Sequence, residues 1–203
     1  PEVDVLIIGG GINGAGTFLD LAINDVNVLL IDRGDFCSGT SATSSHMAHG
    51  GIRYLENGEF RLVREAVAER NRMICNSPHM VKPLPTVIPM FKFWSGLLNA
   101  PFKFLNLLDK PAERGALVIK IGLIFYDSFT GKTRTVPAHK FFGKKETLRR
   151  YPRLNKEAKF SAMYYDGQIL SPERLNTEII LDGESHGLNA HALNYASFQR
   201  MEG

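Results

Sequence analysis

The chain has 203 residues, 44% of them hydrophobic, which suits one domain or two small ones with a real core. Its 24 Lys and Arg against 21 Asp and Glu leave a net charge of +3, too small to indicate a nucleic-acid partner. Cys37 and Cys75 form no C-x-x-C pair, so we predict neither a disulfide framework nor a metal site and favour a reducing compartment. The chain opens on a strand pattern, which argues against a signal peptide. No apolar run approaches the roughly 20 residues of a membrane-spanning helix.

The first 32 residues predict a βαβ unit. Val3–Ile8 is apolar and β-branched, which is typical of a strand buried on both faces. Val26–Ile31 predicts the second strand, and Ile12–Asn24 predicts the helix between them. The helix residues expected on the apolar face are Ile12, Ala15, Leu19 and Ala22.

A glycine turn joins the first strand to this helix. Gly9, Gly11 and Gly14 fill the template G-x-G-x-x-G, in which the glycines permit a tight turn, close approach of a pyrophosphate and close helix–strand packing. Asp32 ends the second strand, where an acid hydrogen-bonds the adenosine ribose. The unit therefore predicts a dinucleotide site, either for NAD or for the ADP half of FAD.

Phe36–Gly51 is rich in hydroxyl groups and glycine and does not predict the next helix of a simple repeat. Such a loop can wrap a long cofactor and give it O–H and N–H donors. A flexible surface loop has the same composition, so both interpretations stay open.

Further elements follow in chain order. Ser171 and Pro172 predict an N-cap followed by proline at the first helical position. The predicted elements are a helix over Glu59–Cys75, extended backbone through Pro78, Pro83, Pro85 and Pro89, a buried helix over Ala116–Tyr126, a short cationic helix over Lys144–Arg150, a strand over Phe160–Tyr165, a helix to His186 that stops at Gly187, and a strand over Ala192–Ala196 that returns to the first sheet.

The segment TSATSSHMAHGGIRYLENGEFRLVREAVAERN, Thr40–Asn71, resembles the FAD-dependent glycerol-3-phosphate dehydrogenases, within the wider group of D-amino acid oxidase and glycine oxidase flavoproteins. HGGIRYLE, at His49–Glu56, is its most specific part. The resemblance continues through PHMVKPLP (Pro78–Pro85), IGLIFYD (Ile121–Asp127) and PERL (Pro172–Leu175).

The resemblance implies an α/β fold: a Rossmann-like FAD-binding domain with an inserted part of a substrate-covering α+β region. We expect residues 1–79 to be the first FAD-binding segment, 80–168 the inserted region and 169–203 the return, incomplete at its C-terminal end. A second glycine motif and further substrate-binding residues would lie beyond Gly203. We therefore expect the piece alone to be catalytically weak or inactive.

The activity implied by the resemblance is oxidation of sn-glycerol 3-phosphate to dihydroxyacetone phosphate. A hydride passes from C2 to the flavin, and the electrons go to quinone, or to oxygen in the oxidase branch. Two alternatives stay open: another FAD-dependent oxidase of amines or hydroxy acids, and a non-catalytic nucleotide-binding module.

Arg53 and Tyr54 match family positions near flavin and substrate, and a guanidinium suits a phosphate or an alkoxide. A plain salt bridge is the alternative for Arg53. His49 is expected to be scaffolding or a cofactor contact rather than a catalytic base. His46 stands where relatives usually carry lysine. The residues expected to bind the cofactor are Gly9, Gly11, Gly14, Asp32, Thr40, Ser41, Ser44, Ser45, His46, His49, Gly50 and Gly51.

Phe91–Leu105 interleaves lysines with aromatic and aliphatic side chains, a pattern of segments that lie in a membrane interface. Pro101 interrupts it, so it is not expected to span. The family's bacterial dehydrogenases are peripheral membrane proteins, which implies a cytoplasmic protein that touches the cytoplasmic face of the membrane. Burial in the inserted region or against another subunit remains the alternative.

Overall fold

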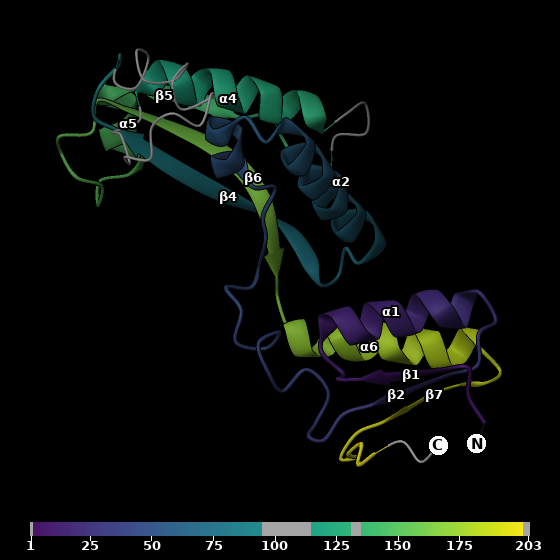
Figure 1. Ribbon diagram of the computed structural model, residues 1–203. Helices are drawn as coiled ribbons and strands as arrows, with labels where there is room; N and C mark the ends of the chain where they lie inside the picture. The colour runs from purple at the N-terminus through teal and green to yellow at the C-terminus, as the bar shows by residue number, and fades with distance from the viewer. Residues whose placement is uncertain (1, 95–114, 131–134, 201–203) are drawn as a thin grey trace. The chain divides into compact units, whose positions relative to one another are not determined.

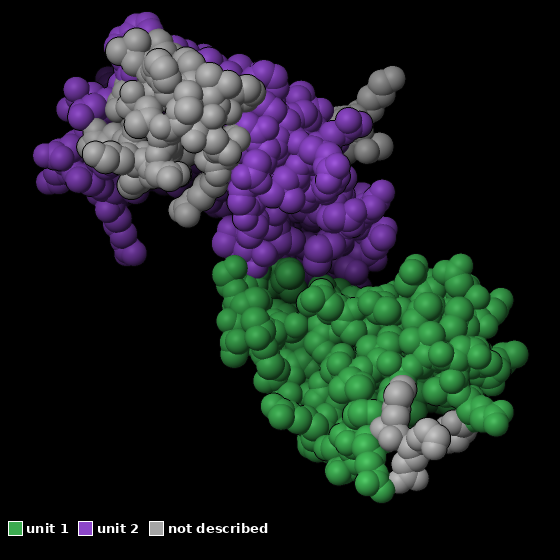
Figure 2. Space-filling view, in the orientation of Figure 1, with its two compact units in different colours: residues 1–46, 169–203 green, residues 47–168 purple. Residues whose placement is uncertain are grey.

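The structure, a computed structural model, describes residues 2–94, 115–130 and 135–200. The chain divides into two compact units: residues 1–46 with 169–203 form unit 1, and residues 47–168 form unit 2 (Figure 2). The chain returns to unit 1 at Ile169. The first division falls after residue 46 rather than 79, because Met47 and Ala48 already pair with a strand of unit 2.

Unit 1 is a parallel sheet with two helices. Strands β1 (Val5–Ile8), β2 (Val28–Ile31) and β7 (Ala190–Leu193) pair in the order β1-β2-β7, and both pairings are parallel. Helices α1 (Ile12–Ile23) and α6 (Pro172–His186) lie side by side on one face of the sheet (Figure 1). This is the Rossmann-like α/β arrangement that the sequence predicts, with β7 as its returning strand.

The core of unit 1 lies between this sheet and its helices. Phe18 is fully buried there and packs closely on α6, since a Cβ on Gly183 would come within 2.6 Å of its ring. The predicted helix face was wrong at Ile12, which is exposed. Ile8 is 63% exposed, because residues alternate along a strand and the described helices cover only one face. The buried cluster is Ala15, Phe18, Ala22, Val28, Leu30, Ile180 and Ala190.

Helix α6 begins and ends where the sequence predicts. Ser171 Oγ accepts a hydrogen bond from Arg174 N–H at 3.4 Å, and Pro172 occupies the first turn. Gly187 is the C-cap residue. The helix boundaries are therefore fixed by local sequence, as N-cap and C-cap signals usually are.

Unit 2 is built on the long strand β6 (Phe160–Ile169). Strand β3 (Met47–Ala48) pairs antiparallel with its end and β5 (Lys140–Gly143) pairs antiparallel with its start. β4 (Val81–Met90) lies at the other edge in the order β3-β6-β4. Strand β4 contains three of the prolines that predicted extended backbone, so this prediction is confirmed. Proline is tolerated in a strand at the edge of a sheet.

Helices η1 (Ile52–Asn57), α2 (Phe60–Asn76), α4 (Ala116–Phe129) and α5 (Lys144–Arg150) complete unit 2. The prediction that α4 is buried was wrong for one side, where Ile121, Ile124 and Phe125 are exposed. The core of the unit consists of Val63, Val67, Met90, Ala116, Ile119, Leu123, Tyr126, Ala162 and Tyr164. Within the described ranges, no helix combines the length and the apolar character needed to cross a membrane.

Candidate functional site

The glycine turn of unit 1 is packed so tightly that side chains are excluded from it. Gly9 has φ +114°, a backbone conformation that favours glycine. A Cβ on Gly14 would lie 1.9 Å from the carbonyl oxygen of Gly9, and one on Gly11 would lie 3.1 Å from Ser41 Oγ. The turn thus has the close helix–strand approach that the fingerprint requires.

Four contacts to Gly9 and Gly10 hold the turn in place. Gly9 N–H donates to the Ile31 carbonyl at 2.8 Å, and Gly10 N–H donates to Asp32 Oδ2 at 2.7 Å. The Gly10 carbonyl accepts from Cys37 N–H at 3.0 Å and from Asn176 Nδ2 at 2.9 Å. The backbone that would face a pyrophosphate is therefore preorganised by the end of β2, by the loop that follows it and by α6.

The N-terminus of α1 suits an anion. Its N-cap, Gly11, supplies no side-chain cap, and no acidic side chain lies in the first turn. Ser41 Oγ accepts from Ile12 N–H at 3.0 Å, so the loop reaches this helix end. Free first-turn N–H groups and the helix dipole bind phosphate, and the glycine cradle leaves no room for a side chain to fill the position. The residues present therefore fit the pyrophosphate of a dinucleotide cofactor.

Asp32 is already engaged by backbone. Its Oδ2 accepts from Gly10 N–H, and its Oδ1 accepts from Gly34 N–H at 2.9 Å. Each carboxylate oxygen has a second acceptor position, so a ribose hydroxyl can still bind. The ribose contact stays a prediction, while the role of Asp32 in shaping the turn is one that the sequence analysis missed.

The hydroxyl-rich loop contains hydrogen bonds between its own residues. Ser44 Oγ accepts from His46 N–H at 3.3 Å, and His46 Nε2 lies 3.2 Å from the Ala42 carbonyl oxygen. The backbone of His46 has φ +54°. Thr40 and Ser45 are exposed. Their contact with a cofactor stays a prediction.

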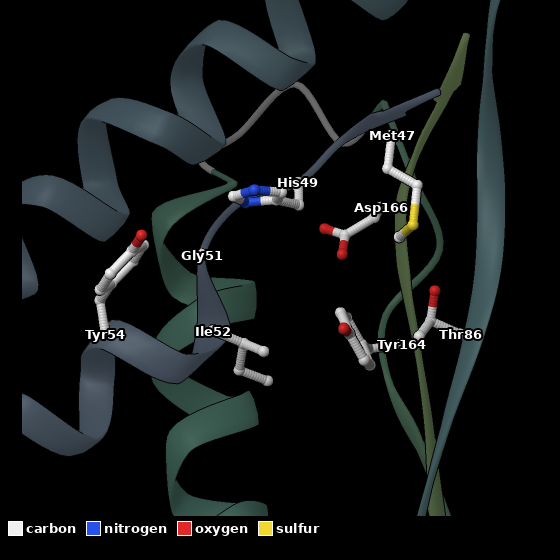
Figure 3. A pocket seen from close by; sticks show the side chains of 8 residues that line it. All are labelled: Met47, His49, Gly51, Ile52, Tyr54, Thr86, Tyr164 and Asp166. Carbon is white, nitrogen blue, oxygen red and sulfur yellow. The ribbon is translucent and has the colours of Figure 1, made fainter. Parts of the chain in front are cut away.

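A pocket of about 600 Å³ lies in unit 2. It receives side chains from the HGGIRYLE segment and from strands β4 and β6 (Figure 3). His49, Gly51 and Tyr54, all predicted site residues, therefore share one wall. The lining residues are Met47, His49, Gly51, Ile52, Tyr54, Thr86, Tyr164 and Asp166.

Gly51 makes the turn into η1. It has φ +68°, and a Cβ there would lie 2.6 Å from the Tyr54 ring. Arg53 belongs to η1, but its side chain lies outside what the structure describes. The geometry thus places Tyr54 at the pocket and leaves the role of Arg53 a prediction.

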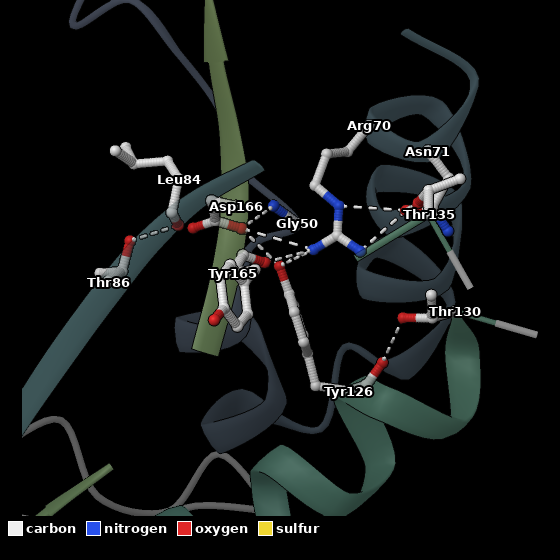
Figure 4. Close-up of polar contacts among 10 residues, drawn as sticks. All are labelled: Gly50, Arg70, Asn71, Leu84, Thr86, Tyr126, Thr130, Thr135, Tyr165 and Asp166. Atoms are coloured by element: carbon white, nitrogen blue, oxygen red, sulfur yellow. Dashed lines mark hydrogen bonds and ion pairs between the residues drawn. The ribbon is translucent and has the colours of Figure 1, made fainter. Parts of the chain in front are cut away.

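A buried polar network adjoins the pocket (Figure 4). Tyr126 Oη donates to Asp166 Oδ1 at 2.5 Å, and Arg70 Nη1 donates to Tyr126 Oη at 2.8 Å. Gly50 N–H also donates to Asp166 Oδ1, at 3.0 Å. Burial raises the pKa of Tyr126 above its ordinary value, Asp166 reinforces the rise and Arg70 opposes it. Tyr126 therefore stays protonated and can donate to Asp166.

The comparisons with known proteins define the class. The chain matches the family of FAD dependent oxidoreductases over residues 4–195, and it belongs to that family, whose cofactor is FAD. Glycerol-3-phosphate dehydrogenase of Synechocystis sp. is 36% identical over 208 residues, which cover 100% of this chain and 34% of that protein. The mitochondrial glycerol-3-phosphate dehydrogenase of Saccharomyces cerevisiae is 35% identical over 98% of this chain and 28% of that protein. The chain thus spans about a third of the length of these relatives.

Solved structures agree on the fold. The glycerol-3-phosphate dehydrogenase from Bacillus halodurans, complexed with FAD, aligns with a TM-score of 0.57 at 23% identity, over 98% of this chain and 27% of that one. The L-alpha-glycerophosphate oxidase from Mycoplasma pneumoniae, with FAD bound, aligns with a TM-score of 0.62 at 17% identity, over 95% of this chain and 44% of that one. At these identities the likeness establishes the fold alone.

Two contributors to the site escaped the sequence analysis. Asn176 is fully buried in α6 and holds the Gly10 carbonyl, and an amide within a largely apolar helix face is a signal that could have found it. Arg70 is 1% exposed and lies three residues after Val67 and four before Ile74, on the apolar stripe of α2. A charge in such a stripe indicates a buried partner.

Proposed function

We propose that this chain is the FAD-binding part of an enzyme that oxidises sn-glycerol 3-phosphate to dihydroxyacetone phosphate. The observation that carries the proposal is 36% identity across the whole chain with a protein named glycerol-3-phosphate dehydrogenase. The fixed glycine turn and the open N-terminus of α1 support the dinucleotide part of it.

The reaction removes two electrons from the C2 carbon. The C2–H bond breaks with its electron pair, the hydroxyl oxygen releases its proton to solvent, and a C=O bond forms. FAD, when bound, supplies the acceptor of the hydride. The subsequent acceptor that we propose is a quinone, which rests on the resemblance alone, and oxygen is the alternative.

Some residues of the chain would bind the cofactor, and others would bind the substrate. Gly9, Gly11 and Gly14 would form the turn that faces the pyrophosphate. Arg53 would bind the substrate phosphate or the alkoxide, because its guanidinium is always charged and presents a planar fork of donors. Tyr54 would line the pocket close to the reacting C2 carbon of the substrate.

Anaerobic reduction of the FAD-loaded full-length enzyme that contains this chain tests this function. We expect glycerol 3-phosphate to bleach the flavin absorbance band and to yield dihydroxyacetone phosphate, whereas glycine, D-amino acids and lactate leave the band intact. Arg53→Ala is expected to retain flavin and to need about 10 to 100 times more substrate, since a charged hydrogen bond contributes about 1.5–3 kcal/mol.

Arg61→Ala is the matched control, because Arg61 is exposed and pairs with Glu65 on the same helix. Bleaching by an amino acid and not by glycerol 3-phosphate would overturn the substrate assignment. Equal substrate affinity in Arg53→Ala and Arg61→Ala would remove Arg53 from the site.

We also propose a peripheral membrane contact near the end of β4. Trp94 is 66% exposed and its ring packs on Phe93 with centroids 4.8 Å apart. Phe91 is exposed too, and exposed Lys159 lies alongside, with its N–H bonded to the Met90 carbonyl at 2.9 Å. Aromatic rings beside a cation suit an interface of anionic lipid. The rest of the predicted segment, residues 95–105, lies outside the described residues.

Flotation with anionic phospholipid vesicles tests this contact. Trp94→Ser is expected to reduce the bound fraction about tenfold or more, since burial of a large apolar side chain contributes about 1.5–3 kcal/mol. Leu188→Ser, which removes a 97% exposed apolar side chain from unit 1, is expected to bind as the unchanged protein does. Failure of the unchanged protein to float, or equal flotation of Trp94→Ser, would contradict the proposal.

A further inference from the structure

The two carboxylate oxygens of Asp166 have different surroundings. Among the described residues, both hydrogen bonds and the ion pair of this side chain end on Oδ1, which receives Gly50 N–H, Tyr126 Oη and, at 3.7 Å, Arg70 Nη1. Asp166 nevertheless lines the pocket, and its carboxyl group points into the space between His49 and Tyr164 (Figure 3). Oδ2 is therefore the oxygen left to face the pocket.

The other members of the network hold Asp166 in one orientation. Arg70 Nη1 also donates to the Tyr165 carbonyl at 2.8 Å, and its Nε and Nη2 donate to Asn71 Oδ1 at 3.2 and 2.8 Å. The guanidinium is thus fixed on several sides. Its positive charge lies beside the buried carboxylate, 3.7 Å from Oδ1.

The backbone is shaped to admit this network. A Cβ on residue 50 would lie 2.2 Å from Tyr126 Oη, so only glycine leaves room for the hydroxyl. Asp166 Oδ1 fixes the amide of Gly50, which lies between the pocket residues His49 and Gly51. One oxygen therefore supports the pocket wall while the other faces the space inside.

We propose that Asp166 is a ligand-binding residue of this pocket, whose Oδ2 accepts a hydrogen bond from an O–H or N–H donor of the bound molecule. The donor is either the hydroxyl of the polyol substrate or an N–H of the flavin ring. The first alternative, called the substrate arm, rests on the proposed function. The second, called the FAD arm, requires only that the protein binds FAD.

Replacement of Asp166 by asparagine separates the two roles of this side chain, which are support of the pocket wall through Oδ1 and ligand binding through Oδ2. Gly50 N–H and the Tyr126 hydroxyl both need an acceptor, so the amide oxygen of Asp166→Asn turns inward and its NH₂ group faces the pocket. The support is kept while the acceptor in the pocket becomes a donor. Tyr126→Phe is the matched control: it removes a buried hydroxyl from the same network and leaves the Asp166 carboxylate in place.

The experiment compares these variants in the FAD-loaded full-length enzyme that contains this chain. FAD affinity is measured by titration, the flavin absorbance spectrum is recorded, and glycerol 3-phosphate is titrated anaerobically against the bleaching of the flavin. Asp166→Asn leaves Arg70 without its charge partner, so the double variant Arg70→Met/Asp166→Asn, which removes both charges, carries the same test if the single variant does not fold.

We expect at least a tenfold loss in one arm for Asp166→Asn and less than threefold for Tyr126→Phe at comparable melting temperature. Loss of glycerol 3-phosphate affinity with unchanged FAD affinity identifies the substrate hydroxyl as the donor. Loss of FAD affinity or a changed flavin spectrum identifies the flavin N–H. Equal, small effects of both variants in both arms overturn the proposal. If glycerol 3-phosphate does not bleach the enzyme without substitutions, the proposed function is refuted. The FAD affinity and the flavin spectrum of Asp166→Asn then test by themselves whether Asp166 binds a ligand.

Discussion

Gly14→Ala is expected to lower the affinity for FAD about 100-fold. The added Cβ would lie 1.9 Å from the Gly9 carbonyl oxygen, so α1 must move away from β1 and carry its N-terminal amides out of reach of the pyrophosphate. Loss of one or two charged hydrogen bonds of about 1.5–3 kcal/mol each gives this magnitude. Equilibrium titration of FAD with the purified chain measures it.

Gly16→Ala is the matched control for this prediction. Gly16 lies in the same helix, is exposed, and a Cβ there meets nothing within 4 Å. Alanine at this position is expected to stabilise the helix by about 0.5–1 kcal/mol and to leave FAD affinity unchanged. If Gly14→Ala binds FAD as tightly as Gly16→Ala does, the turn is not the pyrophosphate site.

Arg70→Met is expected to lower the free energy of unfolding by about 3–5 kcal/mol. The substitution leaves the carboxylate of Asp166, which is 2% exposed, without its opposite charge, and a buried charge without a partner is strongly destabilising. Urea denaturation followed by circular dichroism measures the change.

Arg72→Met separates this effect from a general loss of charge on α2. Arg72 pairs with Glu69 on the same helix at 2.5 Å, but both side chains are well exposed, and such pairs contribute about 0–1 kcal/mol. The double variant Arg70→Met/Asp166→Asn is expected to recover much of the lost stability. A loss for Arg70→Met within 1 kcal/mol of that for Arg72→Met would show that the network is not a stabilising unit.

Features coded by neighbouring residues were predictable from the sequence. The glycine turn between β1 and α1, the Ser171 cap of α6 and its stop at Gly187 each depend on residues within a few positions of one another. The extended backbone of β4 follows from its prolines for the same reason. The returning strand β7 was predictable because a parallel sheet has a place for it beside β2.

Features that depend on distant partners were not predictable from a single sequence. Arg70 finds Tyr126 and Asp166 on two other elements, and Asn176 lies 166 residues from Gly10, whose carbonyl it holds. The exposure of Ile8 depends on which faces of the sheet the described helices cover, which strand composition does not determine. The division after residue 46 depends on the pairing of β3 with β6.

The most direct test of the account is a thermal and spectroscopic titration of the purified chain with FAD. At FAD concentrations 100 times the dissociation constant, binding is expected to stabilise the fold by about 2.7 kcal/mol. For a chain of this size the melting temperature would rise by about 5–10 °C, and the flavin absorbance would change as the ring leaves water. An FAD absorbance spectrum that the chain leaves unchanged, together with a melting temperature that is the same with and without saturating FAD, would contradict the account.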